Sequence, residues 1–156
     1  MKVYLAGPWA RREEVATVGE RFEAAGHTIT EKWWLHEPSN DHDELVRQAT
    51  LDIEGVLTAG LFVVLQLEQS EGKAVETGLA IAGMIPIVVI NPTGERGDTD
   101  AVRVGNMFHH LLKVYPKVDD AIEIANTLQR EYEAWALQTH RESTQRTEGG
   151  NSGNKG

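Results

Sequence analysis

The sequence predicts an α/β protein built on a parallel sheet. Short apolar runs alternate along the chain with longer segments in which apolar residues recur every three or four positions. Strands separated by helices pair in parallel, because each helix carries the chain back to the starting edge of the sheet. The chain has 156 residues, 40% of them hydrophobic and 25% charged. This composition is typical of a single globular domain.

The first part of the chain predicts a strand, a helix and a second strand. Residues 3–6 are an apolar run that ends at a Gly-Pro turn signal. Residues 11–25 carry one apolar stripe at helical spacing, and Gly26 is suited to the end of that helix. Residues 27–34 form the second predicted strand.

The middle of the chain repeats this order. We predict a helix over residues 44–59, a buried strand over 61–65 and an alanine- and leucine-rich helix over 72–82. A fourth strand is predicted over 85–90, where Pro86 is tolerated because it lies at the start of the strand.

The last part predicts a short fifth strand over residues 111–115 and a closing amphipathic helix over 118–137. Residues 141–156 contain no apolar side chain and cannot bury a core. We therefore expect a single domain of residues 1–140 followed by a disordered tail of residues 141–156.

Five strands with intervening helices predict a flavodoxin-like, doubly wound sheet with helices on both faces and strand order 2-1-3-4-5. Such sheets bind ligands at the carboxyl ends of the strands, near the switch between the first and third strands. The candidate segments for a site are therefore residues 7–12 and 68–76.

Charge and composition exclude several classes of protein. The 15 Lys and Arg residues against 24 Asp and Glu residues give a net charge of −9, which disfavours binding to a nucleic-acid polymer or an anionic membrane. The absence of cysteine excludes disulfides and thiol nucleophiles. No apolar run is long enough to span a bilayer and the start does not resemble a secretory signal, so we expect a cytoplasmic protein. The histidine spacing gives no expectation of a metal site.

Two carboxylates are candidates for catalysis. Glu76 lies near the start of a predicted helix, where the helix dipole favours an ionised carboxylate of the kind that acts as a nucleophile in glycosyl transfer. Its alternative role is to complement the dipole on an exposed face. Asp52 shares a helical face with the apolar stripe of Leu45, Ala49 and Val56. It must therefore find partners, act as a proton donor or hydrogen-bond acceptor at a site, or reach solvent on a rotated stripe.

Two further segments are candidates for ligand binding. The turn after the first strand offers backbone N–H groups together with Arg11 and Arg12, which could receive a phosphate or simply form a solvated first turn. This turn lacks the spacing of a dinucleotide fingerprint and of a P-loop. The pair Trp33 and Trp34 could stack on a base or pack in the core.

Taken together, three segments resemble the nucleoside 2-deoxyribosyltransferase superfamily, which includes the 2-deoxynucleoside 5′-monophosphate N-hydrolases. They are the opening run of residues 3–8, the helix that bears Asp52, and residues 70–80, which contain a Gly-x-x-x-Glu-x-Gly motif. Asp52 precedes Glu76 by 24 residues, and the resemblance extends from residue 1 to about residue 110.

The resemblance implies roles for individual residues. Glu76 matches the nucleophile that attacks the anomeric carbon, and Asp52 matches the residue that helps to protonate the departing base. Ser70 matches a position that holds Asp in transferases of free nucleosides and Ser in the monophosphate hydrolases, so it favours a 5′-phosphorylated substrate. Asn106 instead resembles a transferase residue that reaches the 5′-hydroxyl in a neighbouring subunit's site.

The predicted function is cleavage of the N-glycosidic bond of a (deoxy)nucleoside 5′-monophosphate through a covalent ester on Glu76, with release of the free base and no cofactor. The turn and Ser70 are expected to hold the phosphate, and residues 32–34 to line the base. The residues expected to bind substrate are Tyr4, Gly7, Trp9, Arg11, Arg12, Lys32, Trp33, Ser70, Gly72 and Asn106.

Alternative functions remain open at this point. They are a nucleoside 2-deoxyribosyltransferase that exchanges bases, a glycohydrolase of NAD or cyclic ADP-ribose, and a nucleotide-binding module without catalysis. The base, the sugar and the acceptor are not fixed by the sequence. The resemblance also implies a homodimer or larger homo-oligomer that acts on a small nucleoside or nucleotide.

Overall fold

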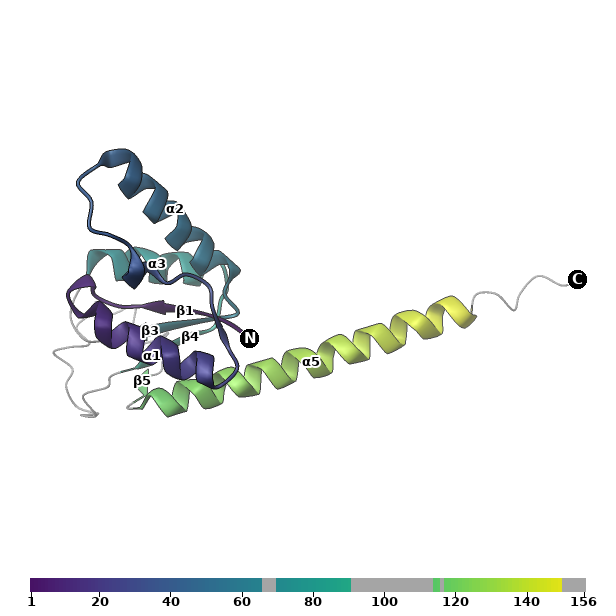
Figure 1. The fold of residues 1–156 in the computed structure, drawn as a ribbon. Helices are drawn as coiled ribbons and strands as arrows, with labels where there is room; N and C mark the ends of the chain where they lie inside the picture. The colour runs from purple at the N-terminus through teal and green to yellow at the C-terminus, as the bar shows by residue number, and fades with distance from the viewer. Residues whose placement is uncertain (66–69, 91–113, 116, 150–156) are drawn as a thin grey trace, which may run out of the picture.

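The structure is a computed structural model and describes residues 1–65, 70–90, 114–115 and 117–149. Its five-stranded parallel sheet has the order β2-β1-β3-β4-β5, which confirms the predicted doubly wound arrangement (Figure 1). The strands are β1 (Lys2–Ala6), β2 (Thr28–Ile29), β3 (Leu61–Leu65), β4 (Ile87–Ile90) and β5 (Val114–Tyr115).

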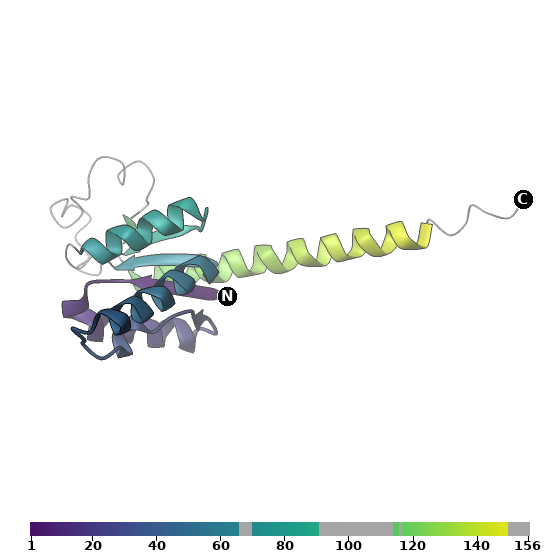
Figure 2. The same cartoon turned by 90° about the horizontal axis from the view of Figure 1, so that it is seen from above.

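Helices cover both faces of this sheet. In Figures 1 and 2, α1 and α5 lie on one face, whereas α2 and α3 lie on the other. The helices are α1 (Arg12–Ala24), α2 (His42–Thr58), α3 (Glu71–Ala82) and α5 (Val118–Gly149), and two short 3-10 helices are η1 (Trp9–Arg11) and η2 (Trp33–Leu35). Within the described ranges, no helix is both long and apolar enough to pass through a membrane.

The core is centred on β1 and β3, the adjacent strands of the sheet. All five residues of β3 are buried, and so are all residues of β1 after Lys2. Successive side chains of β1 point to opposite faces. Leu5 therefore packs near Gly19 of α1, whereas Tyr4 packs near Gly55 of α2. This alternation places Tyr4 on the α2 and α3 face of the sheet.

The second strand is much shorter than the sequence predicts. Only Thr28–Ile29 pair with β1, and the tryptophans that were expected to end the strand lie in η2. Trp33 is buried and donates a hydrogen bond from its indole Nε1 to the Leu5 carbonyl at 2.7 Å. The chain therefore leaves the sheet edge because the large indole packs near the end of β1 instead of continuing the ladder.

The closing helix is much longer than predicted. It ends at Gly149 rather than at Leu137, so it runs through the first part of residues 141–156, the segment expected to be a tail. A helix needs backbone hydrogen bonds and good helix formers, and it can continue without an apolar face. Arg, Glu and Gln recur after residue 140, and two consecutive glycines follow. The helix projects well beyond the sheet (Figures 1 and 2).

The remaining predicted elements agree with the structure to within a few residues. The fifth strand is seen at Val114–Tyr115, and the rest of its predicted range lies outside the described residues. Pro86 directly precedes β4, and Gly26, with φ 87°, adopts the left-handed backbone conformation that suits a glycine after α1.

Candidate active site

Glu76 of α3 contacts Tyr4, a residue of strand β1. The Tyr4 hydroxyl donates a hydrogen bond to Glu76 Oε1 at 2.8 Å. Tyr4 is fully buried, and its ring stacks on Phe62 of β3 with centroids 5.5 Å apart. Helix α3 brings Glu76 to this position after beginning at Ser70, whose side chain accepts a hydrogen bond from the Lys73 backbone N–H. The Glu76 carboxylate is thus held by a rigid donor.

The surroundings of Glu76 favour its neutral form. The pKa of Glu76 is raised to about 7, because burial, the largest cause, and the charge of Asp52 raise it by more than the hydrogen bond from Tyr4 and the charge of Lys73 lower it. Burial, followed by the charges of Glu76 and Asp52, also raises the pKa of Tyr4. The tyrosine therefore stays protonated and acts as a donor, while Glu76 changes its charge near neutral pH.

Asp52 lies on the inward side of α2. Asp41 caps this helix by accepting a hydrogen bond from the Glu44 backbone N–H. Burial raises the pKa of Asp52 to about 6, with His36 lowering it and Glu31 raising it. The Oδ1 atom of Asp52 is buried and has no hydrogen-bond partner among the described residues. Asp52 is of intermediate exposure, with one oxygen turned inward, so its role at the site stays a prediction.

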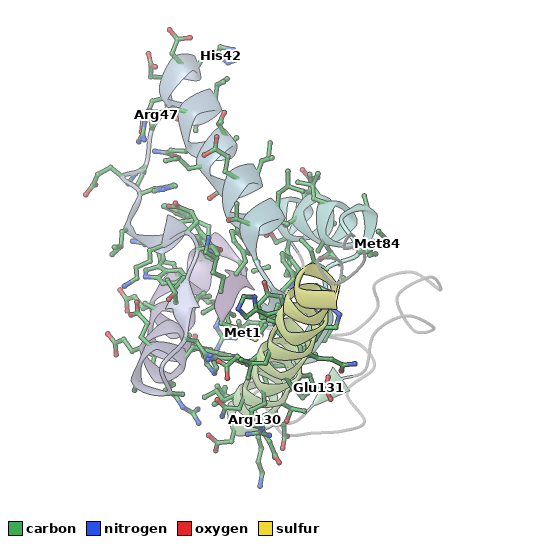
Figure 3. All side chains as sticks on the ribbon, turned by 90° about the vertical axis from the view of Figure 1, so that its right-hand side faces the viewer. Met1, His42, Arg47, Met84, Arg130 and Glu131 are labelled. Atoms are coloured by element: carbon green, nitrogen blue, oxygen red, sulfur yellow. The ribbon has the colours of Figure 1, made fainter. Side chains whose placement is uncertain are left out.

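The predicted apolar stripe of α2 is buried only at its carboxyl-terminal end. Val56 is fully buried, whereas Leu45 is 44% exposed. The reason is that the first half of α2 leans away from the sheet, so His42 and Arg47 stand clear of the other layers (Figures 1 and 3). Only the last two turns of the helix contribute to the site.

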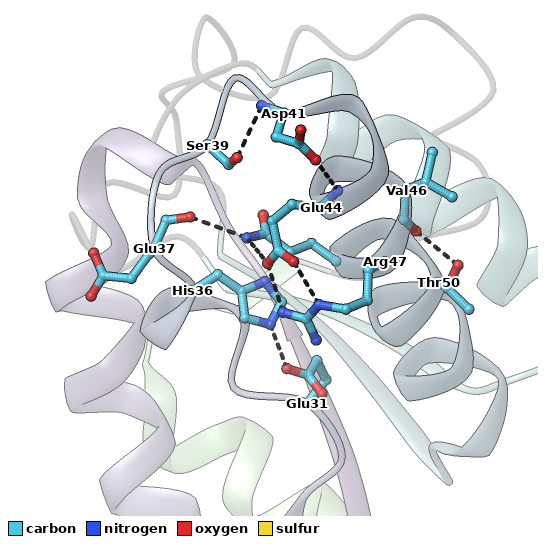
Figure 4. Close-up of polar contacts among 10 residues, drawn as sticks. Glu31, His36, Glu37, Ser39, Asp41, Glu44, Val46, Arg47 and Thr50 are labelled. Atoms are coloured by element: carbon cyan, nitrogen blue, oxygen red, sulfur yellow. Dashed lines mark hydrogen bonds and ion pairs between the residues drawn. The ribbon is translucent and has the colours of Figure 1, made fainter.

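Two residues that the sequence analysis did not select, Glu31 and His36, lie close to Asp52. We call these three residues and Glu76 the acidic group. His36 Nε2 lies 2.9 Å from Glu31 Oε1, and the two side chains are only 12% and 20% exposed (Figure 4). One oxygen or nitrogen from each of Glu31, His36 and Asp52 lies within 4.8 Å of the others. Such donor types also bind divalent cations, but one proton shared between Glu31 and His36 satisfies their contact. The expectation that no metal is needed stays a prediction.

A glycine lets α2 approach this group closely. A Cβ atom on Gly55 would lie 2.7 Å from Glu31 Cβ and 3.0 Å from Tyr4 Cε2. Contacts this short do not occur between real side chains, so any larger residue would push α2 outward. Gly55 therefore fixes the distance between Asp52 and the sheet.

Lys73 is a further residue that the sequence analysis missed. It is only 6% exposed, and its Nζ atom lies 3.5 Å from the carbonyl of Leu65 at the end of β3. A lysine in the first turns of a helix is usually a surface residue, so the sequence offers no signal for its burial. Its charge acts on Glu76 from one turn earlier in the same helix.

The turn expected to bind phosphate packs tightly against α1. A Cβ atom on Gly7 would lie 2.5 Å from Val15 Cγ2, so this position requires a glycine. Arg11 pairs with Glu14, and the Arg12 guanidinium lies 5.1 Å from the centroid of the Trp9 ring. The arginines are thus engaged within the turn itself.

The other predicted binding residues are more dispersed. Lys32 pairs with Glu23 of α1 at 2.8 Å, which gives it a partner outside the acidic group. The burial of Trp33 favours the packing interpretation over stacking on a base. Gly72 is exposed in the first turn of α3, and Asn106 lies outside the described residues.

The fold and site define a flavodoxin-like domain with a partly buried group of carboxylates on one face of its sheet. No protein-family model matches the chain, and no curated protein sequence matches it. Eleven chains of solved structures match its fold, among them the following three. The 2-deoxyribosyltransferase of Bacillus psychrosaccharolyticus is 20% identical, with a TM-score of 0.58, and the match covers 78% of this chain and 90% of that one.

The second match is the CMP N-glycosidase BcmB of Clostridium botulinum. It is 16% identical, with a TM-score of 0.53, and the match covers 81% of this chain and 98% of that one. The third, a conserved protein of Enterococcus faecalis V583, is 21% identical with a TM-score of 0.57 and coverages of 79% and 95%. The chain therefore shares its fold with a deoxyribosyltransferase and an N-glycosidase.

Proposed function

We propose that this protein cleaves the N-glycosidic bond of a nucleoside or nucleotide, with Glu76 as the nucleophile. The observation that carries this proposal is the 2.8 Å hydrogen bond from buried Tyr4 to Glu76. It orients a carboxylate whose pKa is raised to about 7, and such a group is both available as an anion and reactive when desolvated. The shared fold of a deoxyribosyltransferase and an N-glycosidase supports the same class of reaction.

The two acids have different roles in this proposal. A Glu76 oxygen forms a bond to C1′ as the bond from C1′ to the base nitrogen breaks, and the departing base takes both bonding electrons. Asp52, whose pKa is raised to about 6, gives the base its proton. Water then attacks C1′, returns a proton to Asp52 and frees Glu76. A second base in place of water would give transfer.

The proposed substrate carries a 5′-phosphate. The hydroxyl of Ser70 and the first backbone N–H groups of α3 lie at one end of the helix that carries Glu76. The turn with Arg11 and Arg12 is the proposed second contact, and Arg11 would exchange Glu14 for the phosphate when substrate binds. The hydrolase is favoured over the transferase because Ser70, unlike a carboxylate, does not repel a phosphate.

The direct test is to incubate the protein with a panel of nucleosides and their 5′-monophosphates, with and without a second free base, and to separate the products by chromatography. Release of free base supports hydrolysis, and an exchanged nucleotide supports the transferase. Glu76→Gln should abolish both products, whereas Glu71→Gln, at an exposed position of the same helix, should retain them. Full activity of Glu76→Gln would rule out the nucleophile.

The covalent intermediate has its own test. A 2′-fluoro substrate analogue slows breakdown of the glycosyl ester, so peptide mass spectrometry should find the sugar on Glu76. A sugar found on Asp52 instead would reverse the two roles.

We also propose that the protein forms a homo-oligomer. Apolar side chains are exposed on the outer faces of α2 and α3, namely Val46, Ile53, Leu57, Val75 and Ile81. Such exposed apolar residues are typical of interfaces when they cluster. Light scattering coupled to size exclusion should give a mass of at least two chains, and a monomeric mass would contradict the proposal.

A further inference from the structure

We propose that His36, anchored by Glu31, is a positioning residue for Asp52 on the leaving-group side of the reaction. This inference rests on the proposed function and adds to it two side chains that hold the acid in place. It follows from the position of His36 between a loop carboxylate and the helix that carries Asp52.

The geometry of this cluster is held from both sides. His36 directly follows η2, whose Trp33 is fixed to β1 through the Leu5 carbonyl. Glu31 lies against Gly55, where α2 comes closest to the strand. His36 therefore faces Glu31 on one side and α2 on the other (Figure 4). The two loop residues are thus held close to the turn of α2 that carries Asp52.

Asp52 needs such support because its own contacts are few. Its Oδ1 atom is buried and has no hydrogen-bond partner in the described part of the chain. The imidazole lies within 4.8 Å of an Asp52 carboxyl oxygen, so it acts on that carboxyl group through its charge, and a small side-chain rotation would bring the two into hydrogen-bond contact. The bond between His36 and Glu31 fixes the ring in turn, as an orienting carboxylate does for a catalytic histidine. The pair thus aims the proton of Asp52 at the departing base.

The surrounding charges make the roles of the pair separable. His36 lowers the pKa of Asp52, whereas Glu31 raises it. The other titratable or charged groups around the cluster come from β1, α2 and α3, and they are Tyr4, Glu44, Arg47, Lys73 and Glu76. His36→Gln should therefore raise the pKa of Asp52 and Glu31→Gln should lower it, so the limb of the pH profile of kcat that follows Asp52 should move to higher pH in the first variant and to lower pH in the second. A merely structural role would lower activity without these opposite shifts.

The decisive experiment varies the leaving base. A purine methylated at N7 departs as a neutral molecule without being protonated, so it does not need Asp52. An unmodified purine needs a proton to depart as a neutral molecule. For a pyrimidine substrate, the 5-fluoro base is the matching better leaving group. His36→Gln should lose at least about tenfold in kcat on the natural base but less than about threefold on the modified one. Its KM should change little.

Controls separate this inference from the proposed function. Glu76→Gln should be inactive on both bases, because it lacks the nucleophile. His42→Gln, at an exposed position at the start of α2, should match the unmodified protein on both. An equal loss, or no loss, for His36→Gln on the two bases would overturn the inference while leaving the proposed function intact. If His36→Gln does not fold, Glu31→Gln provides the test instead, because it should shift the pKa of Asp52 in the opposite direction.

Discussion

Glu76 and Asp52 form a pair in which burial pushes both acids toward neutral pH. The pKa of Glu76 is raised to about 7 and that of Asp52 to about 6, and the charge of Asp52 contributes to the shift of Glu76. In the proposed reaction Glu76 is ionised and Asp52 keeps its proton. The forms with one negative charge are most populated between the two values, and because Glu76 has the higher pKa, the productive arrangement is the minor one of the two.

This pairing predicts a bell-shaped dependence of kcat/KM on pH. The maximum should fall between about pH 6 and pH 7, because the site loses its anion below this range and its proton above it. Initial rates measured across the pH range with one substrate would show the two limbs. A profile that stays flat between about pH 5 and pH 9 would contradict the assignment of these two acids.

Tyr4→Phe should move the limb of the pH profile that follows Glu76 to higher pH. The hydroxyl of Tyr4 lowers the pKa of Glu76 by stabilising the anion, so its loss makes the carboxylate harder to ionise. Loss of a buried donor to a charged group should also reduce the free energy of unfolding by about 1–3 kcal/mol at about pH 8. The pH profile and urea unfolding would check both effects. A pH profile identical to that of the unmodified protein would show that the hydrogen bond does not act on the reacting form.

Glu76→Gln should stabilise the fold in alkaline solution. The folded pKa of Glu76 lies above its ordinary value of 4.5, so the stability that the neutral acid retains below that value is lost as the pH rises through about 7. The variant does not titrate. It should gain up to about 3 kcal/mol over the unmodified protein at about pH 8 and little at about pH 4. Urea unfolding at both pH values measures the difference.

The packing of α2 against β1 sets the geometry of the site, and two glycines test this. Gly55→Ala would place a methyl group 2.7 Å from Glu31 Cβ, so it should destabilise the protein by about 1–3 kcal/mol and lower kcat by displacing Asp52. Gly78→Ala lies at an exposed position of α3, where the added methyl group would meet no described atom within 4 Å. It should raise the free energy of unfolding by up to about 1 kcal/mol. Urea unfolding and initial rates would show both. Equal effects of the two substitutions would contradict the close approach of α2.

The elements of the sheet could be predicted because their signals are local. The apolar run of β3 is bounded by clear breaks, and the stripe of α1 ends at a glycine with positive φ. The second strand could not be delimited in this way, because Thr28–Ile29 and Trp33 belong to the same run of strand-forming residues. The hydrogen bond from Trp33 to Leu5 decides where the strand ends, and this bond spans 28 positions of sequence.

The site was predictable only where a motif or a periodic pattern marked it. Glu76 and Asp52 were selected from helical position and spacing, and both lie in the acidic group. Glu31 and His36 lie in an irregular segment, where no periodicity relates them to α2. Their place beside Asp52 depends on the approach of that helix at Gly55, which is a property of the tertiary structure.

The whole molecule consists of a compact sheet domain and a long helix, α5, that extends beyond it. Among the side chains of α5 whose burial is described, those that are buried are Val118, Ala121 and Ala125, all near its start, and Leu128 packs beside them. The amino group of Met1 donates a hydrogen bond to Gln129, the residue after Leu128. Beyond this contact the helix is held by its own side-chain pairs, such as Gln129 with Glu133 at 2.9 Å. The fold of the domain therefore depends on the first half of α5.

Two truncations should divide α5 at this point. A chain that stops after His140 keeps every buried side chain of α5 that the structure describes, so its free energy of unfolding should stay within about 0.5 kcal/mol and its activity should not change. A chain that stops after Asn126 loses Leu128 and Gln129, which tie the helix to the core and to the amino terminus. It should lose about 2 kcal/mol or more, because an apolar contact is removed and the N-terminal amino group loses its acceptor. Urea unfolding followed by circular dichroism measures both chains. Equal stability of the two truncated chains would show that the domain does not depend on α5 beyond residue 126, whereas a large loss in the longer one would show that residues 141–156 support the fold.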